Sequence, residues 1–443
     1  MTIEQHAHVP EEVDVVVIGA GAGGLAAAAW LVKAGYRILV VEAKPQVGGR
    51  ASTEPIDGFG VNTGAQIFEL GGANKALFDD VGIPIRARKQ PVPLILRLGR
   101  RDVQVMSGIT GFLANKIGIP VIGGLARRFG WFRPKEGIFL DTWLDQLHAP
   151  VKIKRLCRNL TSALFAAEPS DVIATLFFDY LTKKGGMNTY GAHPDGSIGP
   201  WQDLAAGIQR AGGTILLDTS ATAIGVGDDG RADTVVIRKT DGATVTVRTR
   251  AVISNIGPVA TSRLFPAEAW PADDREKLEA ESFPGTLITI NFASEQPIPN
   301  LTTLVFFGYT ERLAYASYMS GPSPSLAPAG WHLYCVTSTP HPANTGFDLD
   351  EELAILRREA AREFPESARA REVSIANCTG DWPGQRAIPG RDWPNATPIQ
   401  NLWNVGDAAR PWMAAGQSGC VESARIAVDA LIATGLPASH LRD

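Results

Sequence analysis

The chain contains 443 residues, 45% of them hydrophobic, and carries a formal net charge of −4. A chain of this length buries a substantial core and usually folds into two or three structural units. The slightly acidic balance argues against nucleic-acid binding, for which a basic domain is expected. The four cysteines, Cys157, Cys335, Cys378 and Cys420, are too scattered for a metal site or a disulfide scaffold. We therefore expect a globular, cytoplasmic protein without a metal centre.

Residues 1–12 are polar and lack the apolar stretch of a signal peptide, so we expect them to form a flexible tail. Outside the glycine-rich motif described next, no run of about 18 uncharged apolar residues occurs, which argues against a transmembrane helix.

Residues 15–41 predict a strand, a glycine-rich turn, an alanine-rich helix and a second strand. Gly19 allows the tight turn, Gly21 lets the backbone approach a pyrophosphate, and Gly24 lets helix and strand pack closely. Ala22 and Gly23 open the helix, whose free N–H groups face an anion bound there. The segment therefore predicts a dinucleotide-binding βαβ unit.

Glu42 ends the second strand, 23 residues after Gly19, and Ala43 follows it. A carboxylate near this spacing accepts hydrogen bonds from a ribose diol and repels a 2′-phosphate. The acid therefore supports dinucleotide binding and argues against NADP.

Two further motifs follow directly: Gly48-Gly49-Arg50, and the stretch 57–66, which includes Gly64 and Ala65. Here the chain resembles the FAD-containing branch that includes phytoene desaturases, retinol saturase, flavin amine oxidases and protoporphyrinogen oxidase. The resemblance implies that FAD is bound non-covalently. It also implies that Gly48, Gly49, Arg50, Gly64 and Ala65 contact the cofactor. Paired glycines let the chain bend over the nucleotide, and Arg50 offers a charged fork to phosphate or to polar atoms near the flavin. Asn62 departs from the family pattern, which has an acid there.

Residues 108–132 are apolar and aromatic, with charges only at Lys116, Arg127 and Arg128. One interpretation is a buried helix pair interrupted at Pro120, which we favour. The other is a peripheral membrane contact through which an apolar substrate enters from the lipid. Both interpretations stay open.

Periodicity predicts helices over 140–165, 170–184 and 349–364, and several short strands over 285–339. We expect the α/β class: a Rossmann-like FAD-binding domain, with a parallel sheet and a β-meander insert, and an α+β substrate domain inserted in two pieces. The FAD-binding domain is expected to comprise residues 13–107, 185–266 and 395–443. The mainly helical 108–184 and the mixed 267–394 are expected to form the substrate domain.

The stretch 212–258 predicts the meander, with a tight hairpin at Asp241-Gly242. It resembles the middle FAD-domain insert of the same family, and Ser254-Asn255 followed by Gly257-Pro258 resembles the phytoene desaturase subgroup. By this resemblance Asn255 contacts the cofactor. Ala221 stands where the family usually has a valine whose backbone contacts adenine.

Residues 401–432 predict a short strand, a turn and a helix, and resemble the C-terminal flavin-binding element of the family. By the resemblance, Gly406 and Asp407 contact the cofactor, with Asp407 bonded to the ribityl chain. Gly416, Gln417 and Ser418 are also expected to contact the cofactor. Backbone amides near Gln417 to Cys420 are expected to face the flavin, where a helix N-terminus stabilises the negative charge of the reduced form.

Two positions distinguish this chain from amine oxidases of the superfamily. Thr289 stands where those enzymes carry a lysine, and Gly416 stands where they carry an aromatic residue. Trp382 and Arg386 precede the C-terminal element and are candidates for the substrate pocket. Alternatively, Trp382 and Trp393 pack a proline-rich loop.

We expect an FAD-dependent oxidoreductase that moves hydride between the flavin and an apolar, isoprenoid-like substrate, by C–C desaturation or saturation. The electron acceptor is left open. One alternative is an amine or amino-acid oxidase that releases peroxide. The other is a non-catalytic lipid-binding escort protein similar to Rab GDP-dissociation inhibitors, which use no flavin.

Overall fold

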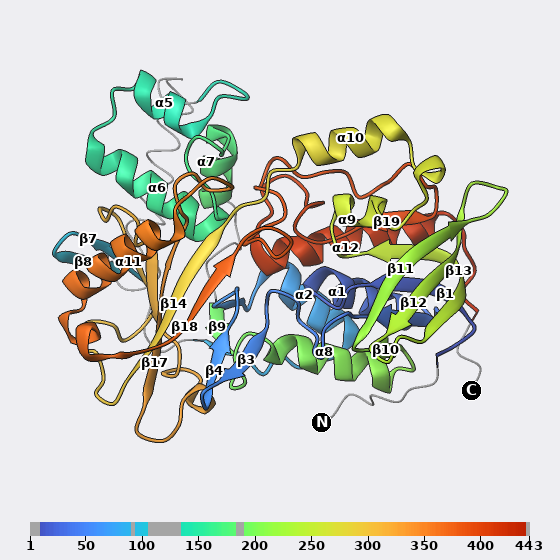
Figure 1. Ribbon diagram of the computed structural model, residues 1–443, viewed down its shortest axis with the longest axis horizontal. Helices are drawn as coiled ribbons and strands as arrows, with labels where there is room; N and C mark the ends of the chain where they lie inside the picture. The colour runs from blue at the N-terminus through green and yellow to red at the C-terminus, as the bar shows by residue number, and fades with distance from the viewer. Residues whose placement is uncertain (1–8, 90–93, 105–133, 183–189, 440–443) are drawn as a thin grey trace.

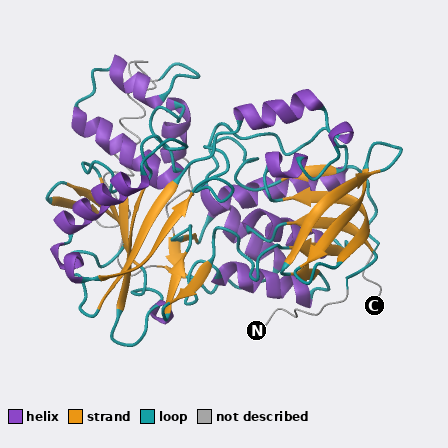
Figure 2. Cartoon of the chain, viewed as in Figure 1, coloured by secondary structure: helices purple, strands orange, loops and turns teal. Residues whose placement is uncertain are grey.

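Two seven-stranded sheets organise the chain, as the computed structural model shows for residues 9–89, 94–104, 134–182 and 190–439. The first sheet and its helices lie at the right of Figure 1, and the second sheet lies at the left. A separate group of helices, α5 to α7, stands at the upper left (Figures 1 and 2). The expected pairing of a Rossmann-like unit with an α+β unit is confirmed.

The first sheet has the strand order β10-β2-β1-β13-β12-β11, and β19 also pairs with β13. Its strands are β1 (Glu12–Ile18), β2 (Ile38–Val41), β10 (Thr214–Leu216), β11 (Thr219–Val226), β12 (Ala232–Lys239), β13 (Thr244–Ser254) and β19 (Leu402–Asn404). The strands β10, β2, β1, β13 and β19 run parallel, whereas β11, β12 and β13 form the antiparallel meander. Because β13 belongs to both parts, the meander extends the parallel sheet.

Turn chemistry accounts for the shape of the meander. Gly242 has a φ of +86°, and Lys239 donates its N–H to Ala243 O at 2.9 Å, which confirms the expected hairpin. The first part of the expected meander, however, divides into β10 and β11 at Asp218, whose φ is +51°. An aspartate tolerates this left-handed conformation better than most residues, so the chain turns there.

Helices α1 (Ala22–Lys33), α2 (Gly72–Val81), α8 (Gly199–Arg210) and α12 (Gly416–Ala433) cover the first sheet, and α1 packs against the other three. Ala26, Ala27 and Ala28 of α1 are fully buried, so their small side chains permit close helix approach. The short helices α9 (Pro258–Ser262) and α10 (Ala272–Glu281) complete this part of the molecule.

The second sheet has the order β18-β14-β17-β16-β15-β7-β8. Its strands are β7 (Ile95–Leu98), β8 (Arg101–Gln104), β14 (Leu287–Ser294), β15 (Val305–Phe307), β16 (Tyr315–Tyr318), β17 (His332–Ser338) and β18 (Arg371–Cys378). Helix α11 (Leu349–Glu363) buries Leu353, Leu356 and Ala360 against this sheet. Two small sheets, β3 (Thr53–Ile56) with β4 (Phe59–Asn62), and β5 (Phe68–Glu69) with β9 (Tyr190–Ala192) and β6 (Arg88–Lys89), lie beside the main sheets.

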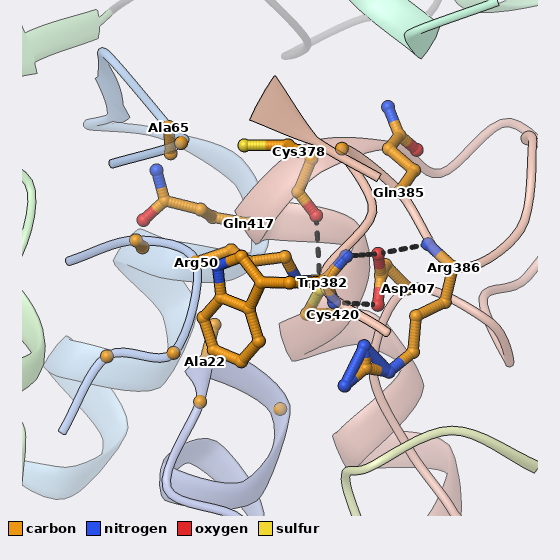
Figure 3. Close-up of a pocket in the computed structure, with 18 of the residues that line it drawn as sticks. Ala22, Arg50, Ala65, Cys378, Trp382, Gln385, Arg386, Asp407, Gln417 and Cys420 are labelled. Atoms are coloured by element: carbon orange, nitrogen blue, oxygen red, sulfur yellow. Dashed lines mark hydrogen bonds and ion pairs between the residues drawn. The ribbon is translucent and has the colours of Figure 1, made fainter. Parts of the chain in front are cut away.

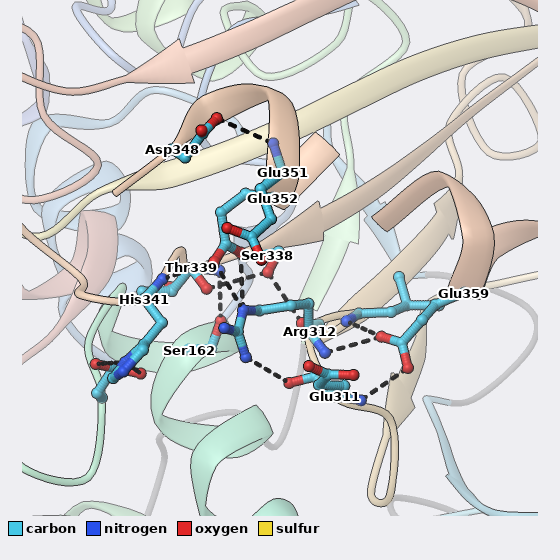
Figure 4. A network of polar contacts seen from close by, with 12 residues as sticks. Ser162, Glu311, Arg312, Ser338, Thr339, His341, Asp348, Glu351, Glu352 and Glu359 are labelled. Carbon is cyan, nitrogen blue, oxygen red and sulfur yellow. Dashed lines mark hydrogen bonds and ion pairs between the residues drawn. The ribbon is translucent and has the colours of Figure 1, made fainter. Parts of the chain in front are cut away.

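A carboxylate network fastens α11 to the turn before β16 (Figure 4). Glu359 accepts the backbone N–H groups of Glu311, Arg312 and Leu313 at 2.8, 2.8 and 2.9 Å. Burial opposes the charged form of Glu359, but these three hydrogen bonds outweigh it and lower the pKa of this carboxyl. Arg312 also donates to Glu352 at 2.8 Å, so the turn is held by charge-assisted bonds.

The helical group contains α5 (Leu140–Gln146), α6 (Val151–Phe165) and α7 (Ala174–Thr182). The expected single helix over 140–165 is wrong, because the chain leaves helical geometry at His148, with a φ of +50°, before Pro150. Proline disfavours a helical conformation in the preceding residue and cannot donate a helix hydrogen bond. The next helix begins at Ala174 rather than at the expected residue 170.

Three expected segment assignments differ from the structure, and the other domain boundaries stay predictions. Residues 9–12 are not a tail, because Val9 is buried in the core and β1 begins at Glu12. Strands β7 and β8, expected in the first FAD-binding segment, extend the second sheet because β7 pairs with β15. Helix α10, expected in the substrate domain, buries Leu278 under the first sheet.

The expected helix pair or membrane contact at 108–132 lies outside the described residues. Within the described ranges, none of the helices has the length and apolar character needed to cross a bilayer.

Candidate functional site

A cavity of about 540 Å³ lies where the first sheet, the second sheet and the helical group meet (Figure 3). Its walls come from the carboxyl ends of β1, β2 and β13, the start of α12, the helices α6 and α7, and strands β14 to β16. In a parallel sheet this edge is the place where loops gather around a ligand.

Most residues expected to bind the cofactor line this cavity: Gly19, Gly21, Ala22, Gly23, Glu42, Ala43, Gly48, Gly49, Arg50, Gly64, Ala65, Ala221, Asn255, Asp407, Gly416 and Gln417. The pocket candidates Trp382 and Arg386 line it as well. Gly24, Gly406 and Ser418 do not. The cofactor contacts of all these residues stay predictions.

The first glycine-rich turn is shaped by close backbone packing. Gly19 has a φ of +91°, and a Cβ on Gly24 would lie 2.0 Å from Gly19 O. Gly24 therefore brings helix and strand together without touching the cavity. A Cβ on Gly21 would lie 2.6 Å from Nδ2 of Asn255, so Gly21 also makes room for the Asn255 side chain. Asn255 likewise crowds Gly406, where a Cβ would lie 2.5 Å from its Oδ1.

Glu42 is held at the end of β2 by two backbone amides, since it accepts the N–H of Ala20 at 2.7 Å and that of Lys44 at 2.9 Å. Its burial raises the pKa of this carboxyl, although the hydrogen bonds oppose the shift. A carboxylate oxygen accepts more than one hydrogen bond, so Glu42 retains acceptor capacity for a ribose hydroxyl.

Two helix N-termini face the cavity without side-chain caps. Helix α1 begins after Gly21 and α12 begins after Ala415, and neither residue supplies a capping hydrogen bond. The first residues of both helices line the cavity, so their free N–H groups carry partial positive charge toward it. The Gln417 side chain is engaged elsewhere, because it accepts from Trp201 Nε1 and donates to Ile67 O, each at 2.8 Å.

A buried charge cluster forms the wall beside α12 (Figure 3). Arg50 donates to both oxygens of Asp407, at 2.6 and 2.5 Å, and the backbone N–H of Arg386 donates to Asp407 Oδ2 at 2.8 Å. Burial would raise the pKa of Asp407, but the charge and hydrogen bonds of Arg50, with the charge of Arg386, hold it well below its usual range. Burial and the neighbouring Arg50 lower the pKa of Arg386 to about 10. The Arg386 guanidinium itself bonds elsewhere, because its Nε donates to Ile256 O at 2.8 Å, and it acts on Asp407 through its charge.

The sequence predicted cofactor contacts for Arg50 and Asp407, which stay predictions, but it did not predict that the two side chains pair with each other. The structure joins them to each other, because opposite charges in a partly buried wall are stabilised most by mutual hydrogen bonds. The cluster keeps one excess positive charge next to the cavity, which suits a diphosphate.

The other end of the cavity is mainly apolar. Ala163 and Leu164 of α6, Leu287 at the start of β14, Leu304 and Phe306 line it. Sequence patterns did not single out these residues, because each also fits an ordinary core position.

Three polar side chains line this same end: Tyr180, Tyr315 and Glu69. Burial raises the pKa values of both tyrosines, which therefore stay protonated at neutral pH. Thr289 does not line the cavity; its Oγ1 lies 3.0 Å from Thr337 Oγ1. The strand position where amine oxidases carry a lysine therefore brings no cation to this end.

Cys378 and Cys420 also line the cavity. Burial raises the pKa of Cys378, and burial together with the nearby Asp407 charge raises that of Cys420 to about 12. Both sulfurs are thus protonated thiols at neutral pH, which are poor nucleophiles. Within the described ranges, histidine, cysteine and acidic side chains form no cluster suited to a metal ion.

These features fit FAD. An acid stands at the end of β2, uncapped helix N-termini and an excess positive charge suit a diphosphate, and an apolar region adjoins them. If FAD binds here, Glu42 would hold the ribose, and the start of α1 together with the segment 48–50 would hold the diphosphate.

Comparison with known proteins gives a family match over most of the chain: the family of flavin-containing amine oxidoreductases, over residues 22–432. The putative flavin-containing monoamine oxidase AofH of Mycobacterium tuberculosis is 28% identical over 239 residues, covering 48% of this chain and 52% of AofH. Human all-trans-retinol 13,14-reductase is 45% identical over 145 residues, covering 31% and 22%. Hydroxyneurosporene desaturase of Rhodobacter capsulatus is 42% identical over 83 residues, covering 19% and 17%. The chain thus matches about half or less of the length of these relatives.

Solved structures share the fold. An oxidoreductase from Methanosarcina mazei superimposes with a TM-score of 0.80 at 23% identity, covering 94% of this chain and 100% of that one. Cyclohexylamine oxidase from Brevibacterium oxydans gives a TM-score of 0.66 at 16% identity, covering 96% and 100%. At these identities the likeness concerns the fold alone.

Proposed function

Because the chain belongs to the family of flavin-containing amine oxidoreductases and is an FAD-dependent oxidoreductase, we propose that it acts on a carbon–carbon bond of an apolar, isoprenoid- or carotenoid-like substrate. In the desaturation direction, a C–H bond gives up hydride to the flavin and the neighbouring carbon loses a proton, so that a double bond forms. Saturation is the reverse. The apolar lining of the substrate end is the observation that carries this proposal.

The apolar residues of this end bind and orient rather than react. The aliphatic and aromatic side chains from α6, β14 and the β15 region exclude water and favour an apolar substrate by burial of its surface. Bound FAD supplies the hydride acceptor or donor. The uncapped start of α12, which lines the cavity, would favour negative charge on the reduced flavin and so support hydride uptake.

We assign the released proton to Glu69, the carboxylate at the substrate end. The tyrosines beside it are weaker proton acceptors, because burial raises their pKa values and keeps them protonated. Glu69 belongs to β5, which pairs with β9 and is thereby fixed in position.

Oxidation of an amine is the second candidate, favoured by the similarity to AofH and by the carboxylate of Glu69, which would pair with an ammonium group. Against it stands Thr289, which leaves the strand without the expected lysine. The family membership favours an enzyme over a lipid escort protein that uses no flavin.

A substrate panel separates the two reactions. Purified protein loaded with FAD is incubated with retinoids, longer isoprenoids and primary amines. Oxygen uptake and peroxide formation are measured, and the masses of the products are determined by mass spectrometry. The proposal predicts an apolar product that differs from its substrate by two hydrogens. Peroxide formation with amines alone would instead establish the amine oxidase.

Two finer aspects are kept as proposals. We infer a cytoplasmic protein. For residues 108–132, peripheral membrane contact is the alternative to the favoured buried helix pair, because it would let a water-insoluble substrate enter from lipid. Co-sedimentation with vesicles, compared between the full chain and a variant carrying added charges in this segment, tests the contact.

A further inference from the structure

The loop that follows β18, residues 379–386, forms one wall of the cavity and is here called the covering loop. It is attached at two points to the segments that follow β2 and β19 of the first sheet. Arg50 Nη1 donates to Pro383 O at 3.1 Å, and the Arg386 backbone N–H donates to Asp407. The loop therefore joins the two main parts of the molecule across the cavity.

A third contact lies at the nucleotide end. The ammonium group of Lys44 lies 3.7 Å from the ring centroid of Trp382, within cation–π range. Lys44 comes two residues after Glu42, the expected ribose acid, whereas Trp382 belongs to the covering loop, and both side chains line the cavity. Among the residues that the structure describes, the Lys44 ammonium forms no salt bridge, so the indole face is its defined partner.

The orientation of Trp382 agrees with a role at this end. Figure 3 shows its indole projecting toward the side of the cavity that carries Arg50 and Ala22, the first residue of α1. The aliphatic and aromatic residues of the substrate end come from other elements, α6, β14 and the β15 region. Trp382 therefore lies with the groups expected to hold the nucleotide.

We propose that Lys44 and Trp382 form a latch that closes the covering loop over the nucleotide end of the cavity and slows the release of FAD. In this assignment Trp382 is a positioning residue for the cofactor and not a contact for the substrate. The proposal rests on FAD binding alone and holds whichever substrate the flavin oxidises or reduces.

The size of the effect follows from the contact. A partly desolvated cation–π pair accounts for a change of about tenfold in an equilibrium or rate, which is about 1.4 kcal/mol at 25 °C. A latch acts after the cofactor has bound, so its loss speeds dissociation more than it slows association.

A double-mutant cycle tests the latch. FAD release from Lys44→Met, Trp382→Leu and the double variant is followed by the rise in flavin fluorescence after dilution. Each single substitution is expected to speed release about tenfold, and the double variant no further than either single one, because both remove the same contact. Lys44→Arg and Trp382→Phe, which keep a cation and a ring, are expected to stay within about threefold of wild type.

Lys277→Met is the matched control, because the Lys277 ammonium also lies over a tryptophan, Trp393, at 5.8 Å, but neither residue lines the cavity. Thermal unfolding of the apo-proteins checks that all variants fold. Multiplicative effects in the double variant would overturn the latch, as would release at the wild-type rate from Trp382→Leu. A change confined to the KM of the substrate would place Trp382 at the other end of the cavity and also overturn it. Failure of the wild-type protein to hold FAD would overturn the cofactor assignment as well, whereas inactivity toward apolar substrates contradicts only the proposed reaction.

Discussion

The substitution Asp407→Asn probes the charge cluster beside the expected diphosphate position. It removes the charge that pairs with Arg50 and leaves the Arg50 guanidinium without its partner, in a mostly buried wall that also carries the positive charge of Arg386. Losing one partner of a fully buried ion pair costs about 3–5 kcal/mol. Because 20% of the Arg50 side chain and 11% of the Asp407 side chain remain exposed, we expect a somewhat smaller loss, about 2–4 kcal/mol.

The assay is urea unfolding of the apo-protein, in which the FAD contribution is absent. Asp79→Asn serves as the control, because the Lys75–Asp79 pair is 57% and 61% exposed and such pairs contribute about 0.5 kcal/mol or less. A loss below about 1 kcal/mol for Asp407→Asn would refute this reasoning, since it would mean that the cluster is solvated in solution.

The pH dependence of the free energy of unfolding tests the contribution of the Asp407 carboxylate independently. The folded-state pKa of Asp407 lies well below the unfolded value of about 3.9, so its stabilising contribution is complete above that value. It is lost as the pH falls from about 4 through the folded pKa. The stability difference between wild type and Asp407→Asn is therefore expected to be constant from pH 5 to 7 and to shrink below about pH 4.

Three further substitutions test other parts of the molecule. Gly24→Ala places a Cβ 2.0 Å from Gly19 O, so we expect it to lower the free energy of unfolding in urea by about 1–3 kcal/mol. Stability close to that of the wild type would contradict the close approach of helix and strand. Glu42→Gln keeps the shape of the side chain but removes the charge that favours ribose hydroxyls, so it should weaken FAD binding about tenfold in fluorescence titrations. NADP is expected to stay unbound. An unchanged affinity for FAD would show that Glu42 does not contact the cofactor. In Glu359→Gln the amide accepts fewer backbone N–H bonds than the three that the carboxylate accepts, so the midpoint of thermal unfolding should fall. An unchanged midpoint would show that this side chain does not stabilise the turn at residues 311–313.

The nucleotide end of the site was predictable because its chemistry is carried by the backbone. Gly19, Gly24 and Glu42 occur at spacings that a strand–turn–helix unit and a ribose acid require, and the structure places Gly19 and Glu42 at the cavity and Gly24 at the helix–strand contact. The break in the expected helix over 140–165 was also predictable from local sequence, because Pro150 lies within that range.

The substrate end was not predictable, because its residues look like ordinary core positions. Leu164 and Phe306 reach the cavity only through the packing of α6 and β15, which no local pattern encodes. The same holds for contacts across long sequence separations. Arg50 and Asp407, 357 positions apart, were each expected to face the cofactor, and only the folded chain shows that they pair with each other. The Lys44–Trp382 contact belongs to the same class.

Anaerobic mixing of the FAD-loaded protein with candidate substrates tests the central claim most directly, because it observes the flavin itself without a terminal electron acceptor. We predict that an isoprenoid or retinoid bleaches the visible flavin absorbance in a single turnover, or that the reduced protein regains its colour with an unsaturated one, and that amines do neither. Bleaching by amines with no response to any apolar compound would contradict the proposed reaction.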